Sequence, residues 1–181
     1  MRKFSMLLFI MFAGFASCKK KPENIIADIM KHYKAINDKQ KDYTVKHVDD
    51  ITSAASGTIT GYYRDDELKK IVAEHFTDSS RTFTEYYFDD GMLIFIFRQN
   101  FVYNCPMSYT EEKARAKGDS VWYDDKKTRL DIDKFYFNLN KMIRWVGPDD
   151  KEIHPQSTRF INKEPELWAE TIVLMKELKE Q

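Results

Sequence analysis

The chain has 181 residues, of which 43% are hydrophobic and 32% are charged, and its formal net charge at pH 7 is zero. This length suits a single domain with a sizeable core. The balanced charge argues against a nucleic-acid partner, which would favour a basic face.

The first residues have the features of an exported protein. Arg2 and Lys3 give a positive start, and a mostly apolar run follows over residues 4–16. The run is shorter than the roughly 20 apolar residues of a membrane-spanning helix, and it matches the apolar region of a signal peptide. Two alternatives remain: residues 4–16 form a core strand or helix, or Gly14-x-Ala16 is a site for the ordinary signal peptidase.

The end of this run resembles the lipobox of bacterial lipoprotein signal peptides. Ala16 and Ser17 fit the two positions before the cysteine, Cys18. Phe15 stands where the family usually has a leucine-like residue. The resemblance covers residues 1–18 and implies that a peptidase removes residues 1–17 and that the Cys18 thiol carries a diacylglycerol. It therefore predicts an exported lipoprotein, anchored in the bacterial cell envelope through membrane lipid.

Residues 18–22 are expected to form the lipidated cysteine and a short basic tether, and residues 23–181 a single α+β domain. The lysines at residues 19–21 either add about 1 kcal/mol each beside an anionic leaflet or form a solvated spacer. If Cys18 is acylated, Cys105 has no cysteine partner, which excludes a disulfide and a cysteine metal site. A buried, inert thiol is therefore expected at Cys105.

Three segments have helical patterns. Residues 23–41 and residues 164–179 place apolar side chains at helical spacing, and Pro165 suits the first turn of the second segment. Residues 111–117 predict a short polar helix that ends at Gly118. The two amphipathic helices are the expected cover of a sheet.

Between the helices, the pattern changes to short aromatic and β-branched runs joined by acidic turns. An aromatic pair, a polar turn and a second strand recur three times; the pairs are Tyr62 and Tyr63, Tyr86 and Tyr87, and Phe135 and Tyr136. Asp90-Gly91 is the strongest turn signal, because a tight primed turn needs positive φ angles. Asp124-Asp125 and Asp149-Asp150 repeat the aromatic-then-turn pattern more weakly and suggest a fourth hairpin. The predicted fold is α+β, an antiparallel meander sheet of repeated β-hairpins covered by an N-terminal and a C-terminal helix.

The sequence contains no recognisable set of catalytic residues. The four histidines lack metal-ligand spacing, and no phosphate loop or nucleophile motif occurs. The acidic doublets are explained by turns. We therefore predict no catalytic residue, no metal and no cofactor. The alternatives are an envelope hydrolase that uses scattered carboxylates such as Glu85 or Asp131, or Cys105 acting as a nucleophile with a distant histidine.

The aromatic pairs are the candidate binding residues. Side chains alternate along a strand, so the two members of each pair point to opposite faces. The candidate binding face is either Tyr62, Tyr86 and Phe135, or Tyr63, Tyr87 and Tyr136. One set is expected beneath the helices; the other binds a ligand, or merely stabilises the sheet through cross-strand pairs. The predicted function is a non-enzymatic binding or scaffold module whose partner is an envelope protein, a peptide or a glycan.

Overall fold

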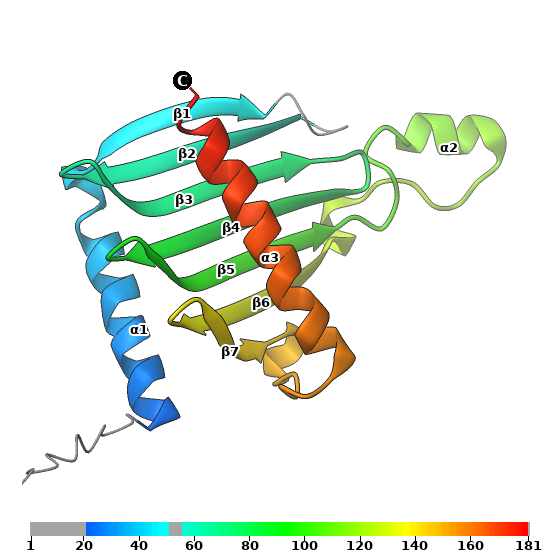
Figure 1. The fold of residues 1–181 in the computed structure, drawn as a ribbon. Helices are drawn as coiled ribbons and strands as arrows, with labels where there is room; N and C mark the ends of the chain where they lie inside the picture. Colours follow the sequence, from blue (N-terminus) through cyan, green and yellow to red (C-terminus); the bar gives the residue numbers. More distant parts are fainter. Residues whose placement is uncertain (1–20, 51–55, 181) are drawn as a thin grey trace, which may run out of the picture.

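The computed structural model describes residues 21–50 and 56–180, so the expected signal peptide, Cys18 and most of the tether lie outside the described residues. The fold is a seven-stranded antiparallel sheet with helices at both ends of the chain (Figure 1). The order of the strands in space follows their order in the chain. The predicted α+β meander of hairpins is confirmed. In the described part of the chain, no helix has both the length and the apolar character needed to cross a membrane.

The strands follow one another along the chain, and one long insertion, which holds α2 and η2, separates β5 from β6. The helices are α1 (Pro22–Asp38), α2 (Glu111–Lys117) and α3 (Thr158–Glu177), with 3-10 turns η1 (Gln40–Asp42), η2 (Asp125–Lys127) and η3 (Pro148–Asp150). The strands are β1 (Thr44–Asp50), β2 (Ser56–Arg64), β3 (Glu67–Phe76), β4 (Ser80–Asp89), β5 (Met92–Val102), β6 (Arg129–Asn138) and β7 (Lys141–Val146). Asp124 caps η2 and Asp125 begins it, while Asp149 and Asp150 lie in η3, so neither doublet forms the turn between two of these strands.

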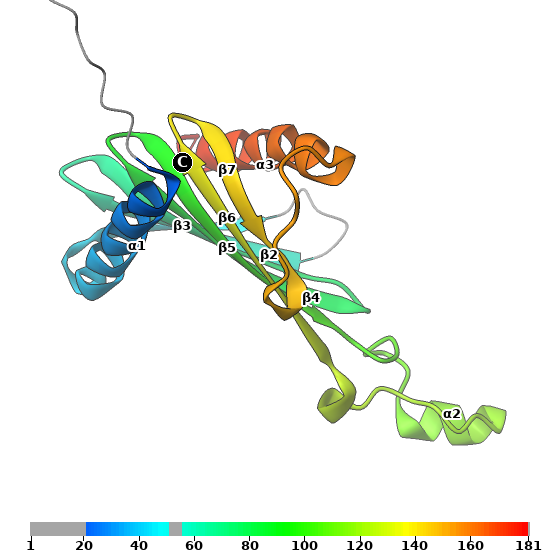
Figure 2. The ribbon, with the colours of Figure 1, turned by 90° about the horizontal axis from the view of Figure 1, so that it is seen from below.

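The two amphipathic helices lie on opposite faces of the sheet, with α1 on one side and α3 on the other (Figure 2). Beneath α3, Leu167 and Leu174 pack on a core that includes Tyr86 and Trp145. Beneath α1, a second, smaller core forms around Ile29 and its neighbours. The sequence led us to expect one covered face and one open face, but near the helices both faces are buried.

The helix ends differ from the predicted ones in ways that capping explains. Helix α1 ends at Asp38, short of residue 41. Helix α3 begins at Thr158, well before residue 164, because the Ser157 side chain accepts the amide hydrogen of Phe160 at 3.2 Å. Pro165 therefore lies inside α3 and not in its first turn. The proline is therefore no start signal here, and the serine upstream is the N-cap.

Three hairpins turn through two residues each, as predicted. The turn residues are Asp65 and Asp66, Asp90 and Gly91, and Leu139 and Asn140, all with positive φ. Positive φ at both positions is typical of type I′ turns, whose twist matches that of the strands. Aspartate, asparagine and glycine tolerate this conformation, but leucine at residue 139 is a rare choice.

The repeat is real, but its first copy is offset by one residue from the predicted alignment. The register shifts directly after Tyr62, Tyr87 and Tyr136 in the three hairpins. Tyr62 is thus equivalent to Tyr87 and not to Tyr86. The position equivalent to Tyr86 is Gly61, where an added Cβ would lie 2.8 Å from the Tyr63 ring and 3.0 Å from Leu178. The Tyr63 ring and Leu178 fill the space of the missing side chain, which the sequence pattern could not reveal.

Candidate functional site

Beneath α3 lies a buried polar network. The Arg98 guanidinium donates to the Glu170 carboxylate at 2.6 Å and to the Thr84 hydroxyl at 3.2 Å. The Tyr86 hydroxyl donates to the other oxygen of Glu170 at 2.6 Å. Burial, reinforced by the Glu170 carboxylate, raises the pKa of Tyr86 well above its ordinary value. Burial opposes the charge of Arg98, but Glu170 and Tyr86 together raise the pKa of its guanidinium.

Beneath α1 lies a second network, centred on Lys70, which is 4% exposed. Its ammonium lies 2.5 Å from the Glu85 carboxylate, donates to the Asn37 side chain at 3.1 Å and lies 5.1 Å from the centre of the Tyr87 ring. Burial, with a smaller contribution from Glu85, raises the pKa of the Tyr87 hydroxyl. In both networks the charges are paired, so both are explained as structural contacts.

The two carboxylates considered for catalysis lie on opposite faces of the sheet. Glu85 shares the α1 face with Lys70. Asp131 lies in the α3-face row of Asn100 and binds Arg129 at 2.9 Å. A sheet therefore separates the two groups, and they cannot act on one bond. Within the described residues, no group of three or more histidine, cysteine or acidic side chains could hold a metal ion.

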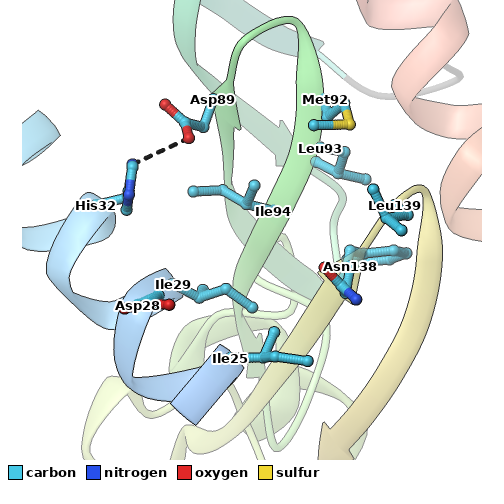
Figure 3. Close-up of a pocket in the computed structure, with 11 residues that line it drawn as sticks. Ile25, Asp28, Ile29, His32, Asp89, Met92, Leu93, Ile94, Asn138 and Leu139 are labelled. Carbon is cyan, nitrogen blue, oxygen red and sulfur yellow. Dashed lines mark ion pairs between the residues drawn. The ribbon is translucent and has the colours of Figure 1, made fainter. Parts of the chain in front are cut away.

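A cavity of about 170 Å³ lies between α1 and the turns of the β4–β5 and β6–β7 hairpins (Figure 3). Its walls include Ile25 of α1, Ile94 of β5 and Leu139 of the β6–β7 turn. At the rim, His32 Nδ1 lies 3.1 Å from Asp89 Oδ2. The cavity has room for a small apolar group.

A more polar hollow of about 350 Å³ lies on the α3 face beside Arg98. The Arg159 guanidinium lies 4.6 Å from the centre of the Trp145 ring, and the Trp145 indole donates to Asp133 at 2.6 Å. The lining carries both cationic and anionic side chains. No single charge therefore selects a ligand there.

The six residues of the predicted binding faces are grouped differently from the prediction, and most are buried. The α3 face holds Tyr63, Tyr86 and Phe135, and the α1 face holds Tyr62, Tyr87 and Tyr136. Tyr86 and Tyr87 are 0% exposed, and Phe135 and Tyr136 are also buried. These four residues build the two cores and offer no surface to a ligand. Tyr62 and Tyr63 remain partly exposed.

An open aromatic surface lies instead on the arm of the molecule, where strands of the sheet extend beyond α1 and α3 (Figure 2). The side of the sheet that α1 covers continues along the arm as cross-strand rows in which phenylalanine is interspersed with Glu74, Arg81 and Gln99. We call the apolar part of this surface the aromatic face; it consists of Phe76, Phe83, Phe97, Phe101, Leu130 and Ile132, and Phe97 joins it to the core beneath α1. All six are at least partly exposed. The Arg81 guanidinium lies between two of the rings, 5.4 Å from the centre of Phe76 and 5.7 Å from that of Phe101.

The opposite side of the arm is polar. His75, Thr82, Asn100 and Asp131 form one cross-strand row there, and the Thr82 hydroxyl donates to Asn100 at 3.2 Å. A sheet face that only meets water is normally polar. The contrast between the two sides of one arm therefore marks the aromatic face as a candidate contact surface.

The sequence prediction did not include the aromatic face, because the tyrosine pairs next to the turns form the more obvious pattern. The signal that could have found it is the alternation along β5, where Phe97 and Phe101 share one parity and Arg98 and Asn100 the other. This alternation shows one aromatic side, interrupted by Gln99, and one polar side. It does not show that these rows lie beyond the helices, which only the packing of α1 and α3 determines.

Cys105 lies in the loop after β5 and is partly exposed, whereas the sequence led us to expect a buried thiol. The neighbouring Asn104 side chain donates to the Trp122 carbonyl at 2.8 Å and accepts the Asp124 amide hydrogen at 3.0 Å. These two hydrogen bonds hold the loop beside Cys105 in place.

No protein-family model matches this chain, and neither a curated protein nor a solved structure matches it.

Proposed function

We propose that the protein is a lipid-anchored protein of the bacterial cell envelope and acts as a non-enzymatic binding module, with the aromatic face as its binding surface. The observation that carries the proposal is the contrast along the arm, which is rich in phenylalanine on one side and has a wholly polar row on the other. A surface of phenylalanine that the described helices leave open is costly in water unless a partner covers it.

The lipobox-like sequence before Cys18 supports the anchor. Helix α1 begins at Pro22, so the folded domain starts directly after the basic tether. Acylation of Cys18 would hold this domain at the membrane surface. The lysines of the tether would add attraction to an anionic leaflet.

The chemistry of the aromatic face favours an apolar surface of another envelope protein as the partner. Phenylalanine rings carry no polar group for the hydroxyls of a glycan. The charges beside the face are already paired, since Arg81 binds Glu74 at 3.2 Å and Lys134 binds Asp150 at 2.8 Å. A phenylalanine-rich surface whose charges are already paired is complemented best by another apolar surface.

The anchor is tested by mass spectrometry of the mature protein and by the variant Cys18→Ser. We expect an N-terminal Cys18 that carries lipid, and we expect the variant to leave the membrane because each buried methylene contributes about 0.8 kcal/mol to attachment. A mature N-terminus at another residue would contradict the anchor.

The binding face is tested by a photo-crosslinking amino acid placed at Leu130 or at Arg129 in the native membrane. Both residues are exposed and adjacent, but Leu130 belongs to the aromatic face and Arg129 to the polar side. We expect a discrete protein adduct from position 130, none from position 129, and loss of the adduct when Phe101→Ser is added. Equal adducts from both positions, or none from position 130, would rule out this face as the binding surface.

A further inference from the structure

The β6–β7 turn places an exposed leucine at the end of the sheet where α1 begins. Leu139 is 74% exposed and has φ of 49°. Leucine disfavours this left-handed conformation and, unlike Asn140 beside it, has no short polar side chain to compensate. Leu139 lies close to the first turn of α1, because it lines the same cavity as Ile25 (Figure 3). Neither turn geometry nor the core explains a leucine here.

The exposed apolar surface continues from this turn onto α3. The Trp168 indole donates to the Asn140 carbonyl at 3.1 Å, and Lys141 binds Glu164 at 3.1 Å. The flank of α3 next to these contacts is apolar. We call Leu139, Ile161, Pro165, Trp168 and Ile172 the turn-edge patch. Ile161 is 58% exposed and Ile172 is 60% exposed.

The apolar flank of α3 is distinct from the face that builds the core. Leu167, Thr171 and Leu174 face the sheet and are buried. Ile161, Pro165, Trp168 and Ile172 follow one another at helical spacing on the neighbouring flank. Trp168 borders the core through its contact with Phe137, whereas Ile161, Pro165 and Ile172 are exposed. The flank on the other side of the core face is charged, with Arg159, Lys163, Glu166 and Glu170. Helix α3 therefore has a second apolar stripe that faces outward, which is typical of helices at a membrane interface.

We propose that the turn-edge patch is a membrane-contact surface that docks on the bilayer holding the lipid of Cys18. This inference rests on the lipid anchor of the proposed function. The chain from Cys18 to Lys21, the first described residue, spans at most about 11 Å when fully extended. The start of α1 is therefore held close to the bilayer surface, and the patch adjoins that start through Leu139.

The docking fixes the orientation of the domain. The start of α1, the β6–β7 turn and α3 lie along one edge of the molecule, and the arm extends away from that edge (Figure 2). With this edge on the bilayer, the arm points away from the membrane. The aromatic face is then presented to a protein partner and not to lipid.

The test uses the full lipidated protein in vesicles of phosphatidylethanolamine and phosphatidylglycerol, with Cys105→Ser as background. A nitroxide label is placed at Leu139→Cys, or at Leu130→Cys on the arm as the matched exposed control. Flotation reports anchoring, and electron paramagnetic resonance reports collisions with oxygen, which enters lipid, and with a water-soluble nickel complex. We expect the label at 139 to collide several-fold more with oxygen than with nickel, and the label at 130 to show the reverse preference.

The outcomes separate this inference from the anchor. Flotation with a label at 139 that prefers nickel would overturn the membrane contact and leave the anchor standing. Failure of the protein to float with the vesicles would contradict both the lipid anchor and the membrane contact. A short label-to-label distance at 139 in dilute vesicles would show a second copy on the patch and would also overturn the inference.

Discussion

The Arg98 guanidinium of β5 and the Glu170 carboxylate of α3 meet at 2.6 Å above the sheet, and the Tyr86 hydroxyl donates to the same carboxylate. This contact ties α3 to the central strand β4 and to its neighbour β5. Because the side chain of Arg98 is 15% exposed, its charge depends on this partner more than a surface charge would.

Glu170→Leu is therefore expected to destabilise the fold by about 2 kcal/mol, less than for a fully buried pair because Glu170 is partly exposed. Glu166→Leu is the matched control on the same helix, since its contact with Lys163 is exposed and worth about 0.5 kcal/mol. Urea denaturation measures both changes. The double variant Arg98→Met, Glu170→Leu should recover most of the loss, and a further loss in the double variant would contradict this account.

The raised pKa of Tyr86 predicts a loss of stability at alkaline pH. A tyrosine whose pKa is higher in the folded state stabilises the fold fully below its ordinary value of 10.0 and progressively less above it. Urea denaturation at a series of pH values should show stability falling as pH rises beyond that value. Tyr86→Phe should make the fall shallower, and the remainder comes from Tyr87 and the other tyrosines whose pKa is raised, such as Tyr136. An unchanged slope in this variant would assign the effect to other groups.

Gly61→Ala is expected to destabilise the fold by about 1–3 kcal/mol through overpacking. Its new methyl group would lie 2.8 Å from the Tyr63 ring and 3.0 Å from Leu178, which is buried beneath α3. Gly147→Ala is the control, because the nearest atoms to its Cβ would lie at 3.6 Å. Thermal unfolding of the two variants distinguishes them, and equal melting temperatures would refute the close packing at Gly61.

The turn conformations make opposite predictions for two residues. Leu139→Asn should stabilise the fold by on the order of 1 kcal/mol, because asparagine tolerates positive φ better than leucine. Gly91→Val, at φ of 71°, should destabilise it by a similar amount or more. Denaturation of the full chain in detergent gives both values. A destabilised Leu139→Asn would mean that Leu139 contributes to the core and not to an outer surface.

The architecture could be predicted because its signals are local. The turns at Asp65-Asp66, Asp90-Gly91 and Leu139-Asn140 each lie between apolar runs, and a meander needs no information beyond successive turns. The bounds of α2 were predicted in full because Gly118 ends it, with φ of 75°. Strand β1 was not predicted, since its partly charged residues form a strand through pairing with β2.

What could not be predicted depends on packing across the sheet. The offset of the first repeat arises from Gly61, whose missing side chain is replaced by Tyr63 and Leu178. A slip of one residue exchanges the two faces, so the tyrosine sets were grouped wrongly. Leu130 and Phe101 pair near the ends of β6 and β5. Whether this part of the sheet is covered depends on where α1 and α3 pack, which no local pattern contains.

Helix α1 has a mechanical consequence for an anchored protein. It packs against β4, β5 and β6, although β1 is the strand that follows it in the chain. A pulling force between the lipid and the arm would therefore act first on the contacts between α1 and the sheet, before it acts on the pairing of any strand. The helix is held by side-chain packing around Ile29, Ile36 and Tyr33 and not by a ladder of backbone hydrogen bonds. Under such load α1 would separate from the sheet while the seven strands stay paired. The chain between the lipid and the sheet would then become longer without unfolding of the sheet.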